Sequence, residues 1–267
     1  MALILNPDYS SFKYAVFIFD KNLFVTQDGQ IPLTGNLENM LQHISGNKVR
    51  SIIAEPEYDY VAIQLAGDAS EELSQFNLKQ IMLREFYAVH SEEESVIPSR
   101  ARAISLWHNS MRYCPSCGTG LLPDSHFTAK KCPSCKIQHF PRIEPCIIVL
   151  VHKGDQVLLV RHKQRNQDIY ACIAGFIEVG ESVEQAVKRE VLEEAGLKIK
   201  NIRFKGTQSW PFPDQLMLAF NADYESGEIK IQEEEISEAK WFNKTEIPAA
   251  PKEGSVAYRL IYGDFAE

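Results

Sequence analysis

The first 90 or so residues alternate short apolar runs with polar stretches rich in Asn, Asp and Gly. YAVFIF (residues 14–19) and YVAIQLA (residues 60–66) are two such runs. Apolar runs of this length between turn-forming residues are typical of strands. The pattern predicts a small α/β or mostly β domain over residues 1–98.

The pattern changes at SEEESVIPSR (residues 91–100), whose charge run and Pro98 favour an exposed connection and a domain boundary near residues 91–99. From residue 99 onward, apolar side chains recur at intervals of three or four, which predicts a helix leading into the first cysteine pair. These side chains are Ala103, Ile104, Trp107 and Met111.

A β-hairpin is predicted further along, because CIIVLV (residues 146–151) and QVLLVRH (residues 156–162) flank the turn-forming KGD. The rest of the chain mixes strands with at least two helices. The predicted fold class is α+β in three parts: an N-terminal α/β domain (1–98), a linker helix with a small metal-binding module (99–140), and a C-terminal domain (141–267).

Composition excludes several classes of protein. Hydrophobic residues make up 45% of the 267 residues and charged residues 24%, which is typical of a globular protein. No stretch approaches the roughly 20 apolar residues that cross a bilayer, and the N-terminus lacks the basic start of an export signal, so we expect a cytoplasmic protein without membrane contact. The formal net charge of -8 disfavours a sequence-independent grip on nucleic acid.

Four of the six cysteines form the pairs CPSC (residues 114–117) and CPSC (residues 132–135), with the spacing C-x2-C-x14-C-x2-C. Four thiolates so arranged predict a closed tetrahedral zinc site with a structural role, one zinc per chain. Redox chemistry of C-x-x-C pairs is the alternative. The predicted ligands are Cys114, Cys117, Cys132 and Cys135.

The surroundings of these pairs predict little more. The nearby positive charges are Lys130, Lys131 and Lys136, which are too few to predict nucleic-acid binding. His126 and His139 are interpreted as surface or packing residues. Cys146 and Cys172 lie in apolar strand contexts and are expected to be buried thiols. We therefore restrict the metal prediction to the four paired cysteines.

The segment GFIEVGESVEQAVKREVLEEAGL (residues 175–197) predicts a glycine-containing loop followed by an acidic helix. Ser182 is the expected N-cap, Gln185 completes a capping box, and Gly196 is the stop signal. The helix would therefore begin after Ser182 and end at Gly196.

On this helix three carboxylates, those of Glu190, Glu193 and Glu194, would project from one face. Without a partner they repel each other by a few tenths of a kcal/mol per pair, a cost that a divalent cation would reverse. Hard oxygen ligands suit Mg²⁺ or Mn²⁺ better than zinc. The alternative is a solvated amphipathic helix whose acidic face binds nothing.

The same segment fits G-x5-E-x7-R-E-U-x-E-E-x-G-U, where U is aliphatic, at every specified position. This pattern is the Nudix box, and through it the chain resembles the Nudix hydrolase superfamily. The matching residues are Gly175, Glu181, Arg189, Glu190, Val191, Glu193, Glu194, Gly196 and Leu197. The resemblance implies an α/β/α sandwich with a mixed sheet, and hydrolysis of a nucleoside diphosphate linked to another group.

The resemblance also implies roles for single residues. The Mg²⁺ or Mn²⁺ ligands would be the Ala174 carbonyl, Glu190, Glu194 and the more distant Glu235. Arg189 would orient the carboxylates. The proton of the attacking water could go to Glu193, Glu194 or Glu235, and the sequence does not choose between them.

After the box comes TQSWPFPDQLM (residues 207–217), where two prolines predict an edge strand or a rigid loop. Trp210 and Phe212 could then stack on a flat base, or they could be core residues. NADH pyrophosphatases of the Nudix superfamily are similar in carrying SQPWPFPxS here. Ser209 stands where that family has Pro, and Gln215 where it has Ser.

This second resemblance implies a homodimer that hydrolyses NADH or NAD to NMNH or NMN and AMP, with NAD-capped RNA 5′ ends as a further substrate. Phe176 would stack on the base, Phe140 would reach the site from the partner subunit, and Ala257 and Arg84 would lie near the substrate. The other substrate-binding positions are Gln208, Ser209, Trp210, Pro211, Phe212, Pro213, Asp214 and Gln215.

Two other functions remain open. The box specifies diphosphate chemistry but not the attached groups, so ADP-ribose or a dinucleoside polyphosphate could be the substrate. A non-catalytic nucleotide-sensing module is the alternative of another class. Loss of box glutamates would mark such a module, and this sequence keeps them all.

Overall fold

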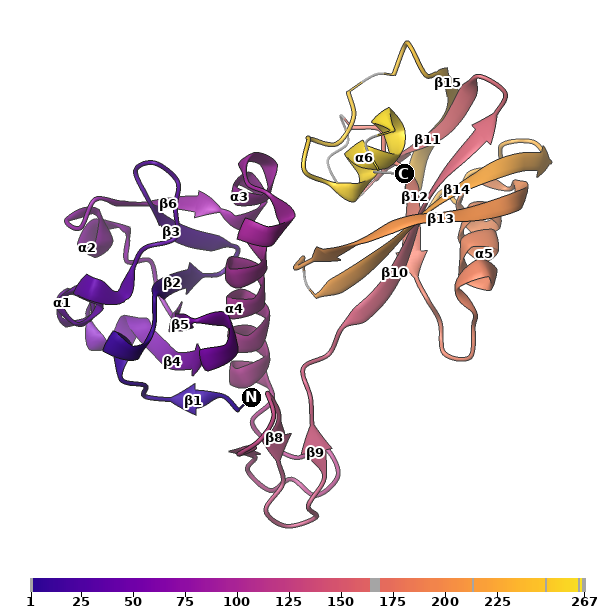
Figure 1. Cartoon of the computed structure of the whole chain (residues 1–267). Helices are drawn as coiled ribbons and strands as arrows, with labels where there is room; N and C mark the ends of the chain where they lie inside the picture. Colours follow the sequence, from indigo (N-terminus) through magenta and orange to yellow (C-terminus); the bar gives the residue numbers. More distant parts are fainter. Residues whose placement is uncertain (1, 164–168, 213, 248, 264, 266–267) are drawn as a thin grey trace. The chain divides into compact units, whose positions relative to one another are not determined.

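The computed structural model describes residues 2–163, 169–212, 214–247, 249–263 and 265. The chain divides into two compact units, Met1–Arg142 and Ile143–Glu267, and each is described by itself (Figure 1). None of the helices within these described ranges has the length and apolar character needed to cross a membrane.

The first unit contains a mixed six-stranded sheet with the strand order β1-β4-β5-β2-β3-β6, in which β2 and β5 are parallel. The strands are β1 Ile4–Leu5, β2 Tyr14–Phe19, β3 Asn22–Thr26, β4 Val49–Glu55, β5 Tyr60–Leu65 and β6 Leu78–Met82. Short 3-10 helices lie at Tyr9–Ser11, Thr34–Asn36, Gly46–Lys48 and Pro56–Tyr58. The α/β character predicted for this part of the chain is confirmed.

Helices cover both faces of this sheet because its strands bury side chains on both sides. Ala15 and Phe17 of β2 pack in one cluster with α1 (Leu37–His43) and α2 (Ser70–Ser74). Val16 and Ile18 pack in another cluster with Ala101, Ile104 and Trp107. The α3 helix (Leu83–Val89) follows β6 directly. The alternation within β2 therefore produces a three-layer unit.

Helix α4 (Glu92–Ser110) corrects one sequence interpretation. The exposed connection expected at residues 91–99 is wrong, because these residues form the N-cap and first turns of this helix. Ser91 and Glu94 form a reciprocal capping box, with Oγ of Ser91 3.2 Å from the Glu94 amide nitrogen. Pro98 lies inside the helix and costs about 3 kcal/mol, which the burial of Ile104 and Trp107 against the sheet offsets.

The predicted helix is confirmed, and Ile104 and Trp107 of the stripe are buried on α4. Ala103 is half-buried, and Met111 is the C-cap that follows the last residue of the helix. The proposed boundary between residues 98 and 99 lies within this helix. The division into domains 1–98, 99–140 and 141–267 stays a prediction about independent folding modules.

A small three-stranded sheet completes the first unit and carries both cysteine pairs. Its strands are β7 Leu122–Pro123, β8 Lys130–Lys131 and β9 Gln138–His139. We call residues 111–142 the ribbon. Buried Lys130 donates to the carbonyl oxygens of His108 and Met111 at 2.6 and 2.7 Å, where the C-terminus of α4 leaves carbonyl groups without helical partners.

A second contact joins the ribbon to the large sheet. Buried Glu55 of β4 accepts hydrogen bonds from Nε and Nη2 of Arg100 at 2.7 and 2.8 Å, and from Oγ1 of Thr128 at 2.9 Å. Tyr60 also donates to this carboxylate. Because Arg100 lies on α4 and Thr128 in the ribbon, one buried carboxylate connects three parts of the unit.

The second unit contains a mixed sheet with the order β13-β14-β10-β11-β15, and β12 also pairs with β10. The strands are β10 Glu144–Lys153, β11 Gln156–His162, β12 Ile173–Phe176, β13 Lys198–Trp210, β14 Gln215–Ser226 and β15 Ile236–Asn243. Strands β10 and β14 are parallel, and the remaining pairs are antiparallel. The predicted β10–β11 hairpin is confirmed.

Two helices cover opposite faces of this sheet, which confirms the α/β/α sandwich (Figure 1). Ile147 and Val149 of β10 pack in the cluster that contains Val187 and Val191 of α5 (Val183–Ala195). The intervening Cys146 and Ile148 pack in the cluster of α6 (Val256–Tyr262). Cys146 and Cys172 are buried thiols, as predicted.

Candidate functional site

Helix α5, which follows the loop after β12, is capped at both ends. Oγ of Ser182 accepts from the Gln185 amide at 3.3 Å, and the Gln185 side chain accepts from the Ser182 amide at 2.7 Å. Gly196 ends the helix with φ of 72°, a left-handed conformation that favours glycine. The predicted capping box and stop are confirmed.

Arg189 holds this loop on the helix. Its Nε and Nη2 donate to the two carboxylate oxygens of Glu181 at 2.8 and 2.9 Å, and Nη2 also donates to the Phe176 carbonyl at 2.9 Å. Its Nη1 donates to Glu190 at 2.8 Å and to Glu193 at 3.0 Å. The hydrogen bonds from Arg189 hold the pKa of Glu181 below its usual value.

Two interpretations change with these contacts. Glu190 and Glu193 are not carboxylates without a partner, since they share one guanidinium nitrogen. Glu181 gains a specific part as the bidentate partner of Arg189, which sequence reasoning did not assign. Its specified position in the Nudix box was the signal that could have indicated this role.

Glu190 lies against the backbone of β12. Only 9% of the residue is exposed, and a methyl group at Gly175 would overlap all three atoms of its carboxyl group. Burial raises the pKa of Glu190; Arg189 opposes this shift, and the negative charges of Glu193 and Glu235 add to it. Glu235 therefore acts electrostatically on the same carboxyl group.

Glu194 is even less accessible, with 1% of the residue exposed. A solvated acidic face would leave such side chains in water, because burying a carboxylate is costly. Glu193, in contrast, has a half-exposed side chain. The burial of Glu190 and Glu194 therefore argues against the alternative of an ordinary solvated helix.

The segment before β15 brings Glu235 toward the end of α5. The Gln232 amide donates to the Glu194 carbonyl at 3.3 Å, and the Glu235 amide donates to the Gln232 carbonyl at 3.1 Å. Ala174 lies in β12, opposite Ile148 of β10. The elements carrying the predicted metal ligands are thus joined by backbone hydrogen bonds within one unit.

The segment expected to bind the base forms the turn between β13 and β14. Trp210 ends β13, Gln215 begins β14, and Pro211, Phe212 and Asp214 lie between them, whereas Pro213 is outside the described residues. The rings of Trp210 and Phe212 are 5.0 Å apart at 69°. Because β13 is an edge strand, the predicted edge strand or rigid loop is confirmed.

Gln208 connects this strand to α6. Its buried side-chain amide donates to the Gly254 carbonyl at 2.8 Å and accepts from the Val256 amide at 2.7 Å. Buried Ala257 follows on the same helix, and half-buried Trp210 and Ala174 pack against the same cluster. Gln208 therefore fixes the relation between the Trp210 strand and the Ala257 helix, while Ser209 is exposed.

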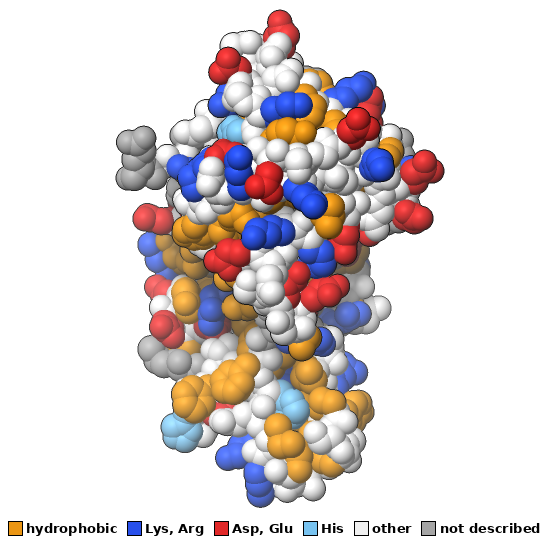
Figure 2. All heavy atoms as spheres, turned by 90° about the vertical axis from the view of Figure 1, so that its right-hand side faces the viewer, with side chains coloured by type: hydrophobic (Ala, Val, Ile, Leu, Met, Phe, Trp, Pro, Cys, Tyr) orange, Lys and Arg blue, Asp and Glu red, His pale blue; other side chains and the backbone are white. Residues whose placement is uncertain are grey.

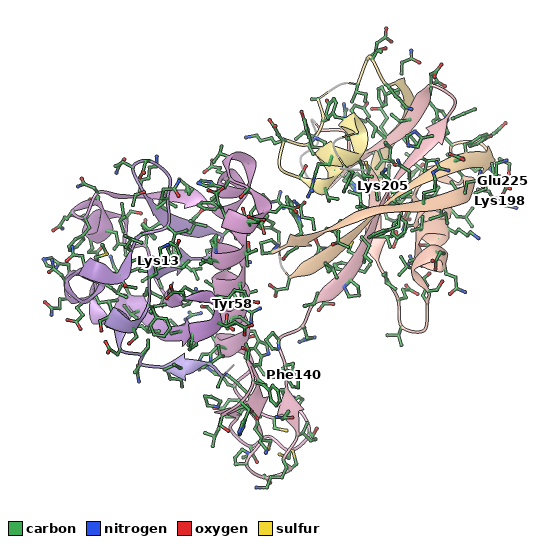
Figure 3. The ribbon with its side chains drawn as sticks, in the orientation of Figure 1. Lys13, Tyr58, Phe140, Lys198, Lys205 and Glu225 are labelled. Carbon is green, nitrogen blue, oxygen red and sulfur yellow. The ribbon has the colours of Figure 1, made fainter. Side chains whose placement is uncertain are left out.

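The other expected substrate contacts fall in both units. Phe176 is exposed at the end of β12 in the second unit. Phe140, exposed directly after β9 (Figure 3), and Arg84, exposed on α3, belong to the first unit. The structure thus brings the glutamates, Ala174, Phe176, Ala257 and the residue 208–215 segment into one unit.

The four paired cysteines form one cluster whose sulfur atoms all lie within 4.8 Å of one another. Within the described parts of the chain, they are the one group of three or more His, Cys, Asp or Glu residues that is this close. The sulfur atom of Cys114 is 3.5 Å from that of Cys135, and that of Cys117 is 3.5 Å from that of Cys132. None of these thiols forms a disulfide.

The two pairs have the same local geometry. The Gly118 amide donates to the Cys114 carbonyl at 2.8 Å, and the Lys136 amide donates to the Cys132 carbonyl at 3.0 Å. Gly118 and Lys136 both have positive φ, 72° and 65°. His139, interpreted from sequence as an ordinary residue, places Nε2 3.6 Å from the sulfur of Cys114. It is a neighbour of the cysteine cluster.

Comparison with known proteins agrees with this geometry. Residues 142–262, which span most of the second unit, match the model of the NUDIX domain. Two curated relatives named NAD-capped RNA hydrolase NudC, from Pseudomonas aeruginosa (strain LESB58) and Escherichia coli (strain SMS-3-5 / SECEC), are each 42% identical to this chain. The matches span 179 and 165 residues, or 67% and 62% of this chain.

The chain covers 64% of the length of each of these relatives. Among solved structures, a NUDIX hydrolase from Nitrosomonas europaea is similar with a TM-score of 0.42 and 24% identity, over 52% of this chain and 81% of that one.

Proposed function

We propose that this protein is a metal-dependent hydrolase that cleaves the diphosphate of NADH or NAD into NMNH or NMN and AMP, and that removes NAD caps from RNA. The observation that carries the proposal is the pair of buried carboxylates, Glu190 and Glu194, held on a complete Nudix box helix. The relatives named NAD-capped RNA hydrolase and the QSWPF segment support the NAD part of the substrate.

The chemistry of the proposed ligand atoms suits Mg²⁺ or Mn²⁺. Glu190, Glu194, Glu235 and the Ala174 carbonyl offer hard oxygen atoms, which these ions prefer. The raised pKa of Glu190 beside two like charges marks a place where a cation would be favourable. Bound there, the ions would neutralise the diphosphate charge and make a water molecule acidic.

The residues of the chain position these ligands. Gly175 leaves room for the Glu190 carboxylate against β12. Arg189, fixed by two hydrogen bonds to Glu181, orients Glu190 and Glu193. The proton of the attacking water goes to Glu193, Glu194 or Glu235. Glu193 and Glu194 lie in the last turn of α5, and the backbone just before Glu235 is hydrogen-bonded to the Glu194 carbonyl.

We assign recognition of the bases to aromatic side chains. Phe176 lies directly after Gly175, and its carbonyl is held by Arg189. In this proposal Phe176 stacks on one face of the base, and Phe140 of the second subunit of a homodimer covers the other. Trp210 and Phe212 line the site from the β13–β14 turn, and Arg84 contacts phosphate.

We also propose that the cysteine cluster holds one structural zinc ion per chain. A tetrahedral site with Zn–S bonds of about 2.3 Å separates its sulfur atoms by about 3.8 Å. The observed sulfur–sulfur separations of 3.5 to 3.9 Å match this value. A dithiol redox centre needs only two thiols, whereas here two pairs meet.

The test is a comparison of initial rates on NADH, NAD, ADP-ribose and NAD-capped RNA, with Mg²⁺ or Mn²⁺. We expect NADH, NAD and the capped RNA to be cleaved with a higher kcat/KM than ADP-ribose. Glu184→Gln, an exposed change on the same helix, serves as the control and should retain full activity. A preference for ADP-ribose would show that the proposed NAD substrates are wrong. Nucleotide binding without hydrolysis would identify a non-catalytic sensor.

A further inference from the structure

The ribbon carries two large aromatic side chains exposed beside each other. Phe127 is 52% exposed and Phe140 is 53% exposed, and their ring centres are 6.2 Å apart at 58°. The ring of exposed His126 lies 6.4 Å from that of Phe127. Neighbouring apolar side chains exposed in this way commonly mark a binding surface.

The turn that carries Phe127 is held rigidly. Buried Asp124 accepts hydrogen bonds from the amides of His126 and Phe127 at 2.8 and 3.1 Å, and its other oxygen accepts from the Gln138 side chain at 2.7 Å. The Ala129 amide donates to the Phe127 carbonyl at 2.7 Å. The backbone of Phe127 is therefore preorganised, which lowers the entropy cost of binding.

The charge of the ribbon is opposite to that of the chain. The chain has a formal charge of -8, but the ribbon has five Lys or Arg residues against the single acidic residue Asp124, giving +4. A zinc centre with four thiolates would contribute 2-, and the ribbon would remain positive. Four of the five cations are exposed: Arg112, Lys131, Lys136 and Arg142.

Figure 2 shows hydrophobic, histidine and Lys or Arg side chains together on the surface of the ribbon, in the lower part of the view. In this ribbon the one acidic side chain, Asp124, is 6% exposed, and both its oxygens accept hydrogen bonds. Among the Asp, Glu, Lys and Arg side chains of the ribbon, the exposed ones are thus all positively charged.

We propose that Phe127, beside Phe140, is a stacking platform for the first bases of the single-stranded RNA that follows an NAD cap. Aromatic faces stack on any base, and the exposed Lys and Arg side chains of the ribbon attract phosphates. Free NADH has no phosphate beyond its diphosphate, so the additional cations favour a longer polyanion. This inference rests on the RNA part of the proposed function and adds Phe127 as a residue that distinguishes capped RNA from the free dinucleotide.

The test uses Phe127→Ala and Phe127→Leu in the full chain, with Phe204→Leu as the matched control. Phe204 is 58% exposed and lies 5.6 Å from Phe220, so it is also an exposed Phe beside another ring, but in the other unit. Two quantities are measured: kcat/KM on NADH and on NAD-capped RNA, and binding of an uncapped, fluorescent single-stranded RNA of about ten nucleotides by anisotropy.

We expect both Phe127 variants to lower kcat/KM on capped RNA and the affinity for uncapped RNA by at least about fivefold, the lower end of the stacking contribution of one base. The kcat/KM on NADH and the behaviour of Phe204→Leu should not change. Lys131→Glu should weaken RNA binding and reduce its dependence on salt, because one phosphate contact is lost.

Equal losses on NADH and capped RNA would overturn the proposal, because Phe127 would then act only by positioning Phe140. If the Phe127 variants have an altered sedimentation coefficient but an unchanged affinity for RNA, Phe127 contacts a second subunit instead. If kcat/KM and RNA affinity are both unchanged, Phe127 is not a stacking platform. If the wild type fails to cleave capped RNA, the RNA part of the proposed function is wrong, whereas the anisotropy measurement still decides whether Phe127 binds RNA.

Discussion

Replacing Gly175 by alanine tests whether the position of the Glu190 carboxylate determines catalysis. The added methyl group would lie closer than 3.0 Å to Cδ and both oxygens of Glu190. No left-handed backbone conformation is required at Gly175, so the substitution adds volume without backbone strain. The effect of the substitution should therefore pass through Glu190.

The size of the effect follows from the overlap. Non-bonded carbon atoms prefer separations of about 3.5 to 4.0 Å, so the carboxylate must move by roughly 1 Å or more. A misplacement of about 1 Å can reduce a rate by about 100-fold, which is about 2.7 kcal/mol in activation free energy. We expect kcat to fall by about this factor.

The assay is kcat and KM for NADH at saturating Mg²⁺, together with the thermal midpoint of unfolding. Gly46→Ala is the control, because no atom lies within 4 Å of the added methyl group. A double-mutant cycle with Glu190→Ala isolates the contact: Gly175→Ala should destabilise the wild type but not the Glu190→Ala variant. A Gly175→Ala enzyme with more than half the wild-type kcat would refute the reasoning.

Four further results are expected. Glu194→Gln should lower kcat by more than about 100-fold with an unchanged fold, while exposed Glu184→Gln should not; retention of half the activity would contradict the metal assignment. Metal analysis should find about one zinc per chain that survives dialysis, and Cys114→Ser should lower both zinc content and the thermal midpoint; a zinc-free wild type of equal stability and activity would argue against the site. Phe140→Ala should raise KM for NADH more than it lowers kcat, and mixing it with Glu194→Gln should restore activity by subunit exchange; a mixture no more active than its components after demonstrated exchange, or a fully active monomeric wild type, would exclude the shared site. Burial, together with the nearby positive charges of Lys130 and Arg112, lowers the pKa of His108 from 6.5 to about 4. Between these two pH values the unfolded chain binds more protons than the folded protein, so the free energy of unfolding should fall as the pH falls from 6.5 to about 4. His108→Gln should weaken this pH dependence, which urea titrations at several pH values can measure.

The sequence predicted the elements whose signals are local. The capping box of Ser182 and Gln185, the stop at Gly196 and the β10–β11 hairpin depend on neighbouring residues, and all three are present. The prediction of where α4 begins was wrong, although the signal was also local. Ser91 and Glu94 form a capping box, but the interpretation gave more weight to the charge run and to Pro98.

The sequence did not predict contacts between residues that are far apart along the chain. The hydrogen bond between Thr128 and Glu55 joins positions 73 residues apart, and no periodicity predicts it. The neighbouring rings of Phe127 and Phe140 depend on the path of the β7–β8 turn, which Asp124 and Gln138 fix through space. In the same way, the closeness of His139 to Cys114 requires the ribbon to be folded.

The central sheet of the second unit has a consequence for how the proposed enzyme can diversify. Helix α5, with the carboxylates, and helix α6, with Ala257, lie on opposite faces, separated by the thickness of the sheet. Substitutions that share no neighbours combine additively in their free-energy effects. Under the proposed function, the carboxylate ligands of α5 and the substrate contacts of α6 can therefore change separately over evolutionary time. A directed-evolution library restricted to those α6 positions that do not contact Ala174 should yield new substrate ranges without eroding the affinity of the glutamates for the proposed cation.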